Sequence, residues 1–390
     1  MSLTFLWPFP PEARTAAAVR LMGFVNAAHA LRIIPVVIVP AGGKIESHSI
    51  QNEVIRLPLY DSISASIGAL GGVVRFPSST LGLITTLRRS HCECLVSSTP
   101  GPFVPFQGLL ASKVLGIPYV LDIRDSWGME KATHQGWLRN AVKEWIERIC
   151  AGAANRVFCV TKMLAMSVRE RYRLNDNKVI VVTNGADLSS FHPGNHRDID
   201  MIFLGTPAEY RNTTGVLEGI AQVSRRRPNI SARLIGWAGA PQTASLLGKA
   251  KQLAIPGGVE FLPPIPHSEV PSIVSRARLG IVSLFNDDRF RTAIGAKTYE
   301  YIASGVPLAC LGPDGKSELR ELVEGRSLGF FASNPEEFGK RTITLLEDEP
   351  RWLELSNNCI AVSQEYDRRK ISERALREVV LPLMGQRSRG

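Results

Sequence analysis

The segment GAKTYEYIASGVP, residues 295–307, places a lysine and a glutamate three residues apart, directly behind a glycine. On a helix this spacing puts the Lys297 ammonium and the Glu300 carboxylate on one face. Gly295 permits close approach of a ligand, and the amides of a helix beginning near Ala296 carry the positive end of its dipole. The pattern predicts that Lys297 meets a diphosphate while Glu300 accepts hydrogen bonds from vicinal hydroxyls. An ordinary surface pair on an amphipathic helix is the alternative.

Length and composition predict two globular domains. The chain has 390 residues, of which 44% are hydrophobic and 21% charged, and no apolar run reaches the roughly 20 residues that a membrane-spanning helix needs. The amino terminus lacks the basic and apolar regions of a signal peptide, so we expect a cytoplasmic protein. The six cysteines are scattered, which favours reduced and buried thiols.

The net charge of +10 is concentrated in the first half of the chain. Residues 1–190 hold 20 Lys and Arg against 13 Asp and Glu, a net of +7, which leaves +3 for the remainder. Such a surface suits nucleic acid, anionic lipid or a phosphorylated substrate. Because no Lys/Arg run or aromatic RNA-binding motif is present, a nucleic-acid partner is not expected.

Apolar runs of strand length alternate with helical patterns along the whole chain, and the alternation restarts after the turn-rich residues 184–194. This predicts an α/β protein of two Rossmann-like parallel-sheet domains that face a central cleft. We assign residues 1–185 to the first domain and 186–365 to the second, with residues 366–390 forming a helix that packs back toward the first domain. Ligands of such sheets bind beyond the carboxyl ends of the strands.

Four stretches, in order, resemble one enzyme family. AKTYEYIASGVPLAC is similar to the nucleotide-sugar motif of family-4 type glycosyltransferases with the GT-B fold, in the bacterial polysaccharide branch that reads K-x-x-E-Y-x-A-x-G-x-P. VVTNGADLSSFHPG resembles its interdomain signature, PYVLDIRDSW its D-x-R-D-x-W strand end, and PFPPEARTAAAVRL its first strand-to-helix loop. The resemblance extends from about residue 5 to the carboxyl terminus.

The resemblance implies transfer of a sugar from a nucleoside diphosphate to an acceptor hydroxyl, with retention of anomeric configuration, without a metal ion and with no cofactor beyond the donor itself. The second domain would bind the donor and the first the acceptor. Glu300 would hold the ribose, and Lys297 with the amides of Gly295 and Ala296 would hold the diphosphate. A further pair would border the phosphate pocket: Gly205 and Thr206.

The sequence departs from the family pattern at two places. Thr292 stands where many relatives have the first glutamate of an E-x7-E pair. Thr206 and Asn212 occupy the positions of an arginine and a lysine that bind the β-phosphate in relatives. Arg211 is the nearest basic replacement, unless it is a solvated turn residue. Two arginines of a later loop compete for the role: Arg289 and Arg291.

At the D-x-R-D-x-W strand end, Arg124 stands where several relatives have a histidine that faces the sugar. An arginine cannot act as a general base at neutral pH, but it can bind a phosphate of the donor or of a lipid-linked acceptor. Asp125 would orient Arg124 or take the acceptor proton. The alternative is an ion pair of Arg124 with Asp122 or Asp125 that stabilises the strand end. Four residues of loops that follow strands are predicted to contact the acceptor: Glu12, Arg14, Ser98 and Thr99.

Other patterns carry weaker indications. Residues 198–200 and 286–288 mimic metal-binding D-x-D motifs, but turns are favoured over a metal site at both. Residues 136–149 carry an apolar stripe at Trp137, Val142, Trp145 and Ile149 beside basic residues. This stripe is core-facing or touches a membrane surface, and the first is favoured. Residues 66–74 are a second candidate for membrane contact. No G-x-G-x-x-G follows the first strand, which argues against a nicotinamide dehydrogenase.

Together these features predict a retaining, metal-independent transferase that moves a sugar to a hydroxyl of a glycan or a lipid-linked acceptor in cell-surface polysaccharide synthesis. It would act in the cytoplasm, with a peripheral contact of the basic first domain to the inner face of the membrane. Two alternatives stay open. One is a nucleotide-sugar epimerase of the same fold, using Glu12, Asp122 or Asp125 as acid or base. The other is a non-catalytic, nucleotide-binding partner subunit.

Overall fold

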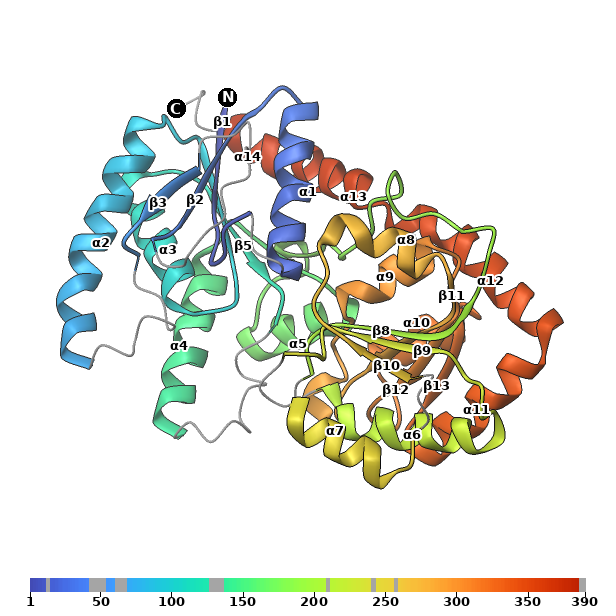
Figure 1. Cartoon of the computed structure of the whole chain (residues 1–390). Helices are drawn as coiled ribbons and strands as arrows, with labels where there is room; N and C mark the ends of the chain where they lie inside the picture. Colours follow the sequence, from blue (N-terminus) through green and yellow to red (C-terminus); the bar gives the residue numbers. More distant parts are fainter. Residues whose placement is uncertain are drawn as a thin grey trace. The chain divides into compact units, whose positions relative to one another are not determined.

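The structure is a computed structural model that describes residues 1–11, 15–41, 54–59, 69–125, 137–207, 211–239, 243–255 and 259–385, with the backbone alone at 69–75, 137–140 and 289. Its internal contacts divide the chain into two compact units. One comprises the residues up to Thr183 together with those from Arg368 onward, and the other runs from Asn184 to Asp367. Each unit is built around a parallel sheet (Figure 1).

The first unit contains a seven-stranded sheet in the order β3-β2-β1-β4-β5-β6-β7, and all of its neighbouring strands are parallel. Alternate strand residues face two separate apolar layers, which is why the strands read as continuous hydrophobic runs. Its strands are β1 (Ser2–Leu6), β2 (Ile34–Pro40), β3 (Val54–Leu57), β4 (Cys94–Ser98), β5 (Tyr119–Ile123), β6 (Arg156–Cys159) and β7 (Val179–Val181).

Helices cover both faces of the first sheet, as crossovers between parallel strands require. The helices of the N-terminal part of the unit are α1 (Ala16–Ala30), α2 (Ala69–Arg89), α3 (Phe103–Leu115), α4 (Trp137–Ala153), α5 (Lys162–Tyr172) and the short η3 (Asp176–Lys178). The chain's last elements complete the unit: α13 (Arg368–Ala375), η8 (Leu376–Val380) and α14 (Leu381–Gly385).

These last elements lie along α1 (Figure 1). Gly23 of α1 makes the close approach possible, because a Cβ at this position would stand 3.0 Å from Cγ of Arg368 and 3.0 Å from Oγ of Ser372. Ile371 and Leu376 join the apolar layer that α1 forms against the sheet. The carboxyl-terminal helices therefore belong to the core of the first unit.

The second unit contains a six-stranded parallel sheet in the order β10-β9-β8-β11-β12-β13. Its strands are β8 (Ile199–Leu204), β9 (Ala232–Ile235), β10 (Val259–Leu262), β11 (Ala277–Ser283), β12 (Leu308–Leu311) and β13 (Gly329–Ala332). Its helices are α6 (Thr213–Arg226), α7 (Thr243–Gln252), α8 (Val270–Val274), α9 (Ala296–Ala303), α10 (Glu318–Gly325), α11 (Pro335–Glu347), α12 (Glu349–Ser363), η5 (His267–Glu269), η6 (Asp288–Phe290) and η7 (Gln364–Tyr366). The predicted pair of Rossmann-like parallel-sheet domains is confirmed.

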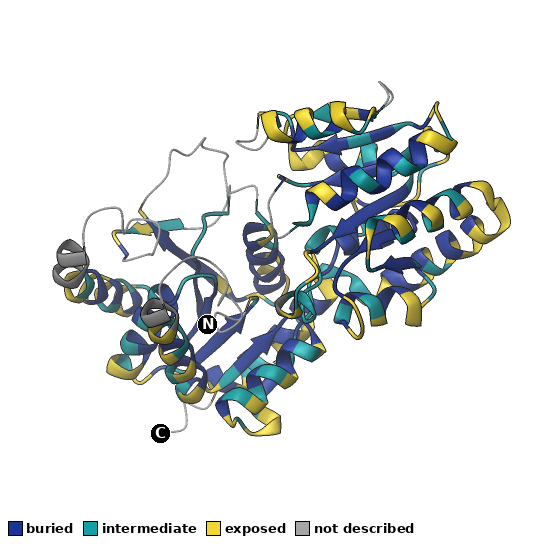
Figure 2. Cartoon of the chain, turned by 90° about the horizontal axis from the view of Figure 1, so that it is seen from below, coloured by how far each residue is buried: buried dark blue, intermediate teal, exposed yellow. Residues whose placement is uncertain are grey.

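Each sheet reverses its strand order once, between β1 and β4 in the first unit and between β8 and β11 in the second. Loops diverge at such a reversal, so ligands of open parallel sheets bind there. The inner strands are buried, whereas β3 and β10 at the sheet edges are partly exposed, as are the outer faces of the helices (Figure 2). All six cysteines are buried and none forms a disulfide, as predicted. Among the described helices, we find none with the length and apolar character needed to cross a bilayer.

Candidate active site

The loop after β8 begins with a glycine that an arginine side chain covers. Gly205 has a φ of +132°, which L side chains rarely adopt. A Cβ built on it would stand 1.8 Å from Nη1 of Arg211, so the guanidinium lies directly against this glycine. Gly236, at the end of β9, is also close, because its Cβ would stand 3.0 Å from the carbonyl carbon of Gly205. The missing side chain of Gly205 therefore makes room for the Arg211 guanidinium, and that of Gly236 lets the loop after β8 pass close to the end of β9.

The position of Arg211 is fixed by its neighbours at the strand ends. Its carbonyl oxygen accepts a hydrogen bond from the hydroxyl of Ser283, the last residue of β11. Asn212 follows in a left-handed conformation, with φ of 45°, and caps α6 by accepting a hydrogen bond of 3.3 Å from the Gly215 amide. Asn212 thus serves as a helix cap, whereas Thr206, the other polar residue at a family phosphate position, is exposed.

Arg291, one of the two competing arginines, is bound elsewhere. Its Nε lies 2.5 Å from Oδ1 of Asp288, and its Nη1 donates a hydrogen bond of 2.9 Å to the carbonyl of Lys316. A Cβ on Gly315 would stand 3.1 Å from the same Nη1, so the loop before α10 closes around this side chain. Arg291 therefore holds two loops together. The side chain of Arg289 lies outside the described part of the structure.

Helix α9 begins at Ala296, and its N-cap residue, Gly295, has no side chain to cap the first turn. Its leading amides can therefore bind an anion. Lys297 Nζ lies 3.1 Å from Oε2 of Glu300, as the spacing of three residues predicts. Gly295 has no neighbouring heavy atom within 4 Å of where its Cβ would stand, so the helix start is open.

Glu300 is the one buried acid of α9, with a side chain that is 2% exposed. Nε2 of His267 lies 3.2 Å from its Oε1 and donates to it, since a carboxylate can only accept. Burial by itself raises the pKa of this carboxyl, but the hydrogen bond from His267 and the charge of Lys297 outweigh burial, so the pKa lies below its ordinary value. Among the described residues, none donates a hydrogen bond of normal geometry to Oε2.

Sequence reasoning missed His267, which lies 33 residues before its partner. The available signal was its place just after β10, because residues that follow the strands of a parallel sheet meet at one edge. Its ring is seated edge-on against Phe191, with centroids 5.9 Å apart. The histidine is thus a fixed neighbour of the predicted ribose ligand.

Tyr301 anchors α9 to the end of β8. Its hydroxyl accepts a hydrogen bond of 3.0 Å from the Leu204 amide and donates one of 3.3 Å to the Ile202 carbonyl. The ring passes over Gly280 of β11, where a Cβ would stand 2.5 Å from the ring carbon Cγ. Because Tyr301 is adjacent to Glu300, this contact also sets the position of the carboxylate relative to the sheet.

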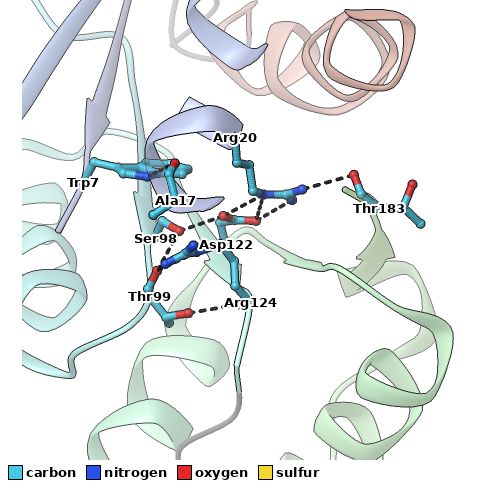
Figure 3. A network of polar contacts seen from close by, with 8 residues as sticks. All are labelled: Trp7, Ala17, Arg20, Ser98, Thr99, Asp122, Arg124 and Thr183. Atoms are coloured by element: carbon cyan, nitrogen blue, oxygen red, sulfur yellow. Dashed lines mark hydrogen bonds and ion pairs between the residues drawn. The ribbon is translucent and has the colours of Figure 1, made fainter. Parts of the chain in front are cut away.

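A buried ion pair lies at the carboxyl end of the first sheet (Figure 3). Arg20 of α1 reaches Asp122 of β5, with Nη2 2.7 Å from Oδ1 and Nε 3.1 Å from Oδ2. The Ser98 hydroxyl donates to the same carboxylate at 2.7 Å, and Arg20 also donates to the carbonyl of Thr183 at 3.1 Å. Asp122 is fully buried, so its charge is balanced entirely within the chain.

Arg124 folds back onto the end of β4. Its Nε donates a hydrogen bond of 2.7 Å to the Thr99 carbonyl, and its backbone amide donates one of 2.9 Å to the Thr99 hydroxyl (Figure 3). Burial lowers the pKa of Arg124, an effect that the charges of Asp125 and Asp122 oppose. The ion pair of Asp122 with Arg124 that we held as an alternative is not the contact found, because Arg20 takes the Asp122 carboxylate instead.

The structure describes three of the remaining first-domain candidates. Ser98 and Thr99 are fully buried and hold the strand ends, and Asp125 is exposed. Their contacts with an acceptor stay predictions. Glu12 and Arg14 lie outside the described residues.

Two family descriptions match the two halves of the chain in order. "Glycosyl transferase 4-like domain" matches residues 15–185, and "Glycosyl transferases group 1" matches residues 187–365. By both domains the chain belongs to the GT-B glycosyltransferases.

Individual relatives agree with this glycosyltransferase assignment. D-inositol 3-phosphate glycosyltransferase of Corynebacterium diphtheriae is 26% identical over 203 residues, covering 46% of this chain and 45% of the relative, so the chain spans about half the length of the curated relatives it matches. Sucrose-phosphate synthase from Thermosynechococcus elongatus shares the fold with a TM-score of 0.76 at 13% identity, covering 99% of both chains. Anabaena Alr3699/HepE, solved with UDP and glucose, has a TM-score of 0.74 at 15% identity, covering 97% of this chain and 99% of its own.

The apolar stripe predicted for α4 is divided: Ile149 packs against the core, two members are exposed, and the side chain of Trp137 lies outside the described part of the structure. Val142 is 44% exposed and Trp145 is 57% exposed, whereas Ile146 and Cys150 are buried against the sheet. Our favoured prediction of a core-facing stripe was therefore wrong for these two residues. Glu147, two residues after Trp145 and so on the opposite side of the helix, is fully buried instead.

The two metal-like motifs are occupied by contacts within the chain. Asp198 pairs with Arg276, and Asp200 accepts a hydrogen bond of 2.9 Å from the Ser231 amide. Asn286 exchanges two hydrogen bonds with Asp314, at 3.1 Å and 3.0 Å. Among the described residues, no group of three or more His, Cys, Asp or Glu is placed to hold a metal ion.

Proposed function

We propose that this glycosyltransferase moves a sugar from a nucleoside-diphosphate sugar to a hydroxyl of a glycan or lipid-linked acceptor in cell-surface polysaccharide synthesis, with retention of configuration and without a metal ion. The observation that carries the proposal is the buried Glu300 carboxylate, whose Oε2 lacks a hydrogen bond of normal geometry from the described residues, directly behind the uncapped start of α9. A buried carboxylate oxygen with unused acceptor capacity suits a ribose diol.

Three sources of positive charge suit the diphosphate. The α9 amides at Gly295 and Ala296 carry the helix dipole, Lys297 stands in the first turn, and Arg211 covers Gly205 at the end of the neighbouring strand β8. In our proposal they neutralise the charge that develops on the leaving phosphate, which is the role a divalent cation plays in other transferases. Arg211 replaces the family's arginine and lysine pair.

The transfer step needs little further chemistry from the protein. The acceptor hydroxyl attacks the anomeric carbon on the face that the diphosphate leaves, so the new C–O bond replaces the old one with retention. The departing phosphate oxygen takes the acceptor's proton, and the protein supplies position and charge. Arg124 would bind a phosphate of the donor or acceptor, with Asp125 orienting it.

Of the two alternatives, the epimerase needs an acid or base that can reach the sugar. Asp122, one of its three candidates, is fully buried and paired with Arg20, so it cannot activate a water molecule in this arrangement. This favours the transferase. Incubation with donor alone separates the two, because an epimerase changes the sugar whereas a transferase hydrolyses the donor slowly.

The basic first domain would also contact the inner face of the membrane. On α4 the exposed Val142 and Trp145 stand beside exposed Arg148. The two acids of this part of the helix leave little negative charge exposed, because Glu144 pairs with Arg171 and Glu147 is buried. An exposed tryptophan beside basic residues suits an anionic lipid surface.

Calorimetric titration with UDP, GDP and ADP, in buffer containing EDTA, tests the donor site. We expect one of the three to bind the wild-type protein, and Glu300→Gln to weaken it by about tenfold, as loss of a charge-assisted hydrogen bond does. If none of the three binds, or if Glu300→Gln titrates like the wild type, the proposed donor site is wrong.

A further inference from the structure

The Glu300 carboxylate has two polar neighbours that come from different elements. Lys297 stands on α9 itself, with Nζ 3.1 Å from Oε2. His267 stands on η5, after β10, with Nε2 3.2 Å from Oε1. A buried carboxylate is stable only while it is paired or hydrogen-bonded, so each partner matters.

Lys297 has a second task under the proposed function. It is required at the donor diphosphate, and a lysine ammonium on a flexible stem can turn from one anion to another. When Lys297 turns to the phosphate, Glu300 loses the cation beside Oε2 while it must remain a carboxylate to accept from the ribose hydroxyls. The chain then has to hold Glu300 by its other oxygen.

His267 is built to do this. Its side chain is 43% exposed, so the imidazole is at the rim of the site and not deep in the core. Its ring rests on Phe191, a residue that is 1% exposed, and Pro266 precedes it. Because neither support belongs to α9, the histidine keeps its position independently of Lys297.

We propose that His267 is a positioning residue of the donor site, which holds Oε1 of Glu300 so that Oε2 meets the ribose diol while Lys297 engages the diphosphate. The inference rests on the proposed function, because it assigns a role at the same donor site. It concerns binding of the ribose alone. Removing His267 therefore weakens recognition of the diol and leaves recognition of the diphosphate unchanged.

The test compares a nucleoside diphosphate with its 2′,3′-dideoxy analogue. UDP, GDP and ADP are titrated first, and the one that binds wild-type protein is paired with its analogue. We expect His267→Ala to weaken the natural nucleotide by about tenfold and the analogue by less than about twofold. His267→Gln places an amide nitrogen close to the position of Nε2 and should restore most of the affinity, whereas His267→Asn, one carbon shorter, should not.

His192→Ala is the matched control, because this exposed histidine of the same domain lies 3.3 Å from the carbonyl of its own neighbour, Pro193. It should bind both nucleotides as the wild type does. If His267→Ala weakens both ligands equally, or neither, His267 does not position Glu300, and the proposed function stands. If the wild type binds no nucleoside diphosphate, or binds the dideoxy form as tightly as the natural one, it is the proposed ribose site that is wrong.

Discussion

The Arg211 guanidinium occupies the space in which any side chain at position 205 would lie. Nη1 stands 1.8 Å from the Cβ that Gly205 lacks, and the glycine has a φ of +132°. The two residues depend on each other. Because Gly205 has no side chain, the Arg211 guanidinium can lie at the end of β8, where the strand order of the second sheet reverses. In the proposed donor site, this cation six positions from the glycine would replace the arginine that directly follows the glycine in relatives.

Gly205→Ala should affect both stability and binding. The backbone conformation is strained for alanine, which costs about 1–3 kcal/mol, and the new methyl group displaces the mobile end of Arg211. We expect a lower Tm and weaker nucleoside diphosphate binding by calorimetry. Gly248→Ala is the matched control, because Gly248 lies within α7 with no heavy atom within 4 Å of its Cβ position, and alanine there should raise stability by about 0.5–1 kcal/mol. Equal effects of the two substitutions would contradict this account.

Substitution of Arg211 and of Arg291 should affect nucleoside diphosphate affinity very differently. Arg211→Ala removes a charge-assisted contact to phosphate and should weaken nucleoside diphosphate binding by about tenfold to a hundredfold. Arg291→Ala removes a mostly exposed ion pair with Asp288, worth at most about 1 kcal/mol, and should leave the affinity within about twofold. Titration of both variants with the same nucleotide shows which arginine binds the phosphate. The opposite ranking would make Arg291 the phosphate ligand.

The fold could be predicted from the sequence because its signals are local. Buried parallel strands read as short apolar runs, and the crossover rule then leaves few arrangements for them. The pairing of Lys297 with Glu300 could also be predicted, since three residues of helix determine it. Contacts of this range need no knowledge of tertiary packing.

Long-range partners could not be predicted in the same way. Arg20 and Asp122 are 102 residues apart, and His267 and Glu300 are 33 apart, so neither pair leaves a periodic signal. The α4 stripe failed for a related reason. Hydropathy predicts that a glutamate lies outside and that valine and tryptophan lie inside, but Glu147 is buried whereas Val142 and Trp145 are exposed. Tertiary packing overrode the local pattern.

Glu300 should make the protein's stability depend on pH in acid. Its pKa in the folded chain lies below the ordinary value of about 4.5, so the carboxylate stabilises the fold above that pH. This contribution is lost as the pH falls through the folded-state pKa. We expect the Tm difference between wild type and Glu300→Gln to be constant from pH 7 to pH 5 and to shrink below about 4.5. A difference that stays constant to pH 3 would show that the carboxylate is not stabilised by His267 and Lys297.

Trp145 should govern binding to anionic vesicles. Trp145→Ala removes an exposed ring and should reduce co-sedimentation with phosphatidylglycerol vesicles several-fold, with little change in Tm. Leu353→Ala is the control, because this residue is an apolar side chain of the second domain that is 52% exposed. Binding to phosphatidylcholine vesicles should be weak for all three proteins. Wild-type protein that fails to co-sediment with either vesicle would rule out the membrane contact.

The buried pair of Arg20 and Asp122 should contribute to the stability of the first domain and take no part in the reaction. Asp122→Asn leaves the Arg20 charge buried without its partner, which should destabilise the protein by about 3–5 kcal/mol, and Ser98→Ala should cost about 1 kcal/mol. Denaturant unfolding of Arg20→Met, Asp122→Leu and Arg20→Met/Asp122→Leu measures the coupling, and we expect the double variant to be more stable than Asp122→Asn. The rival chemistry needs a separate measurement, because the buried pair would be lost in Asp122→Asn whatever the reaction. An epimerase that used Asp122 as its acid or base would convert the donor sugar in the wild type and would lose this conversion in Asp122→Asn at temperatures where the variant is still folded.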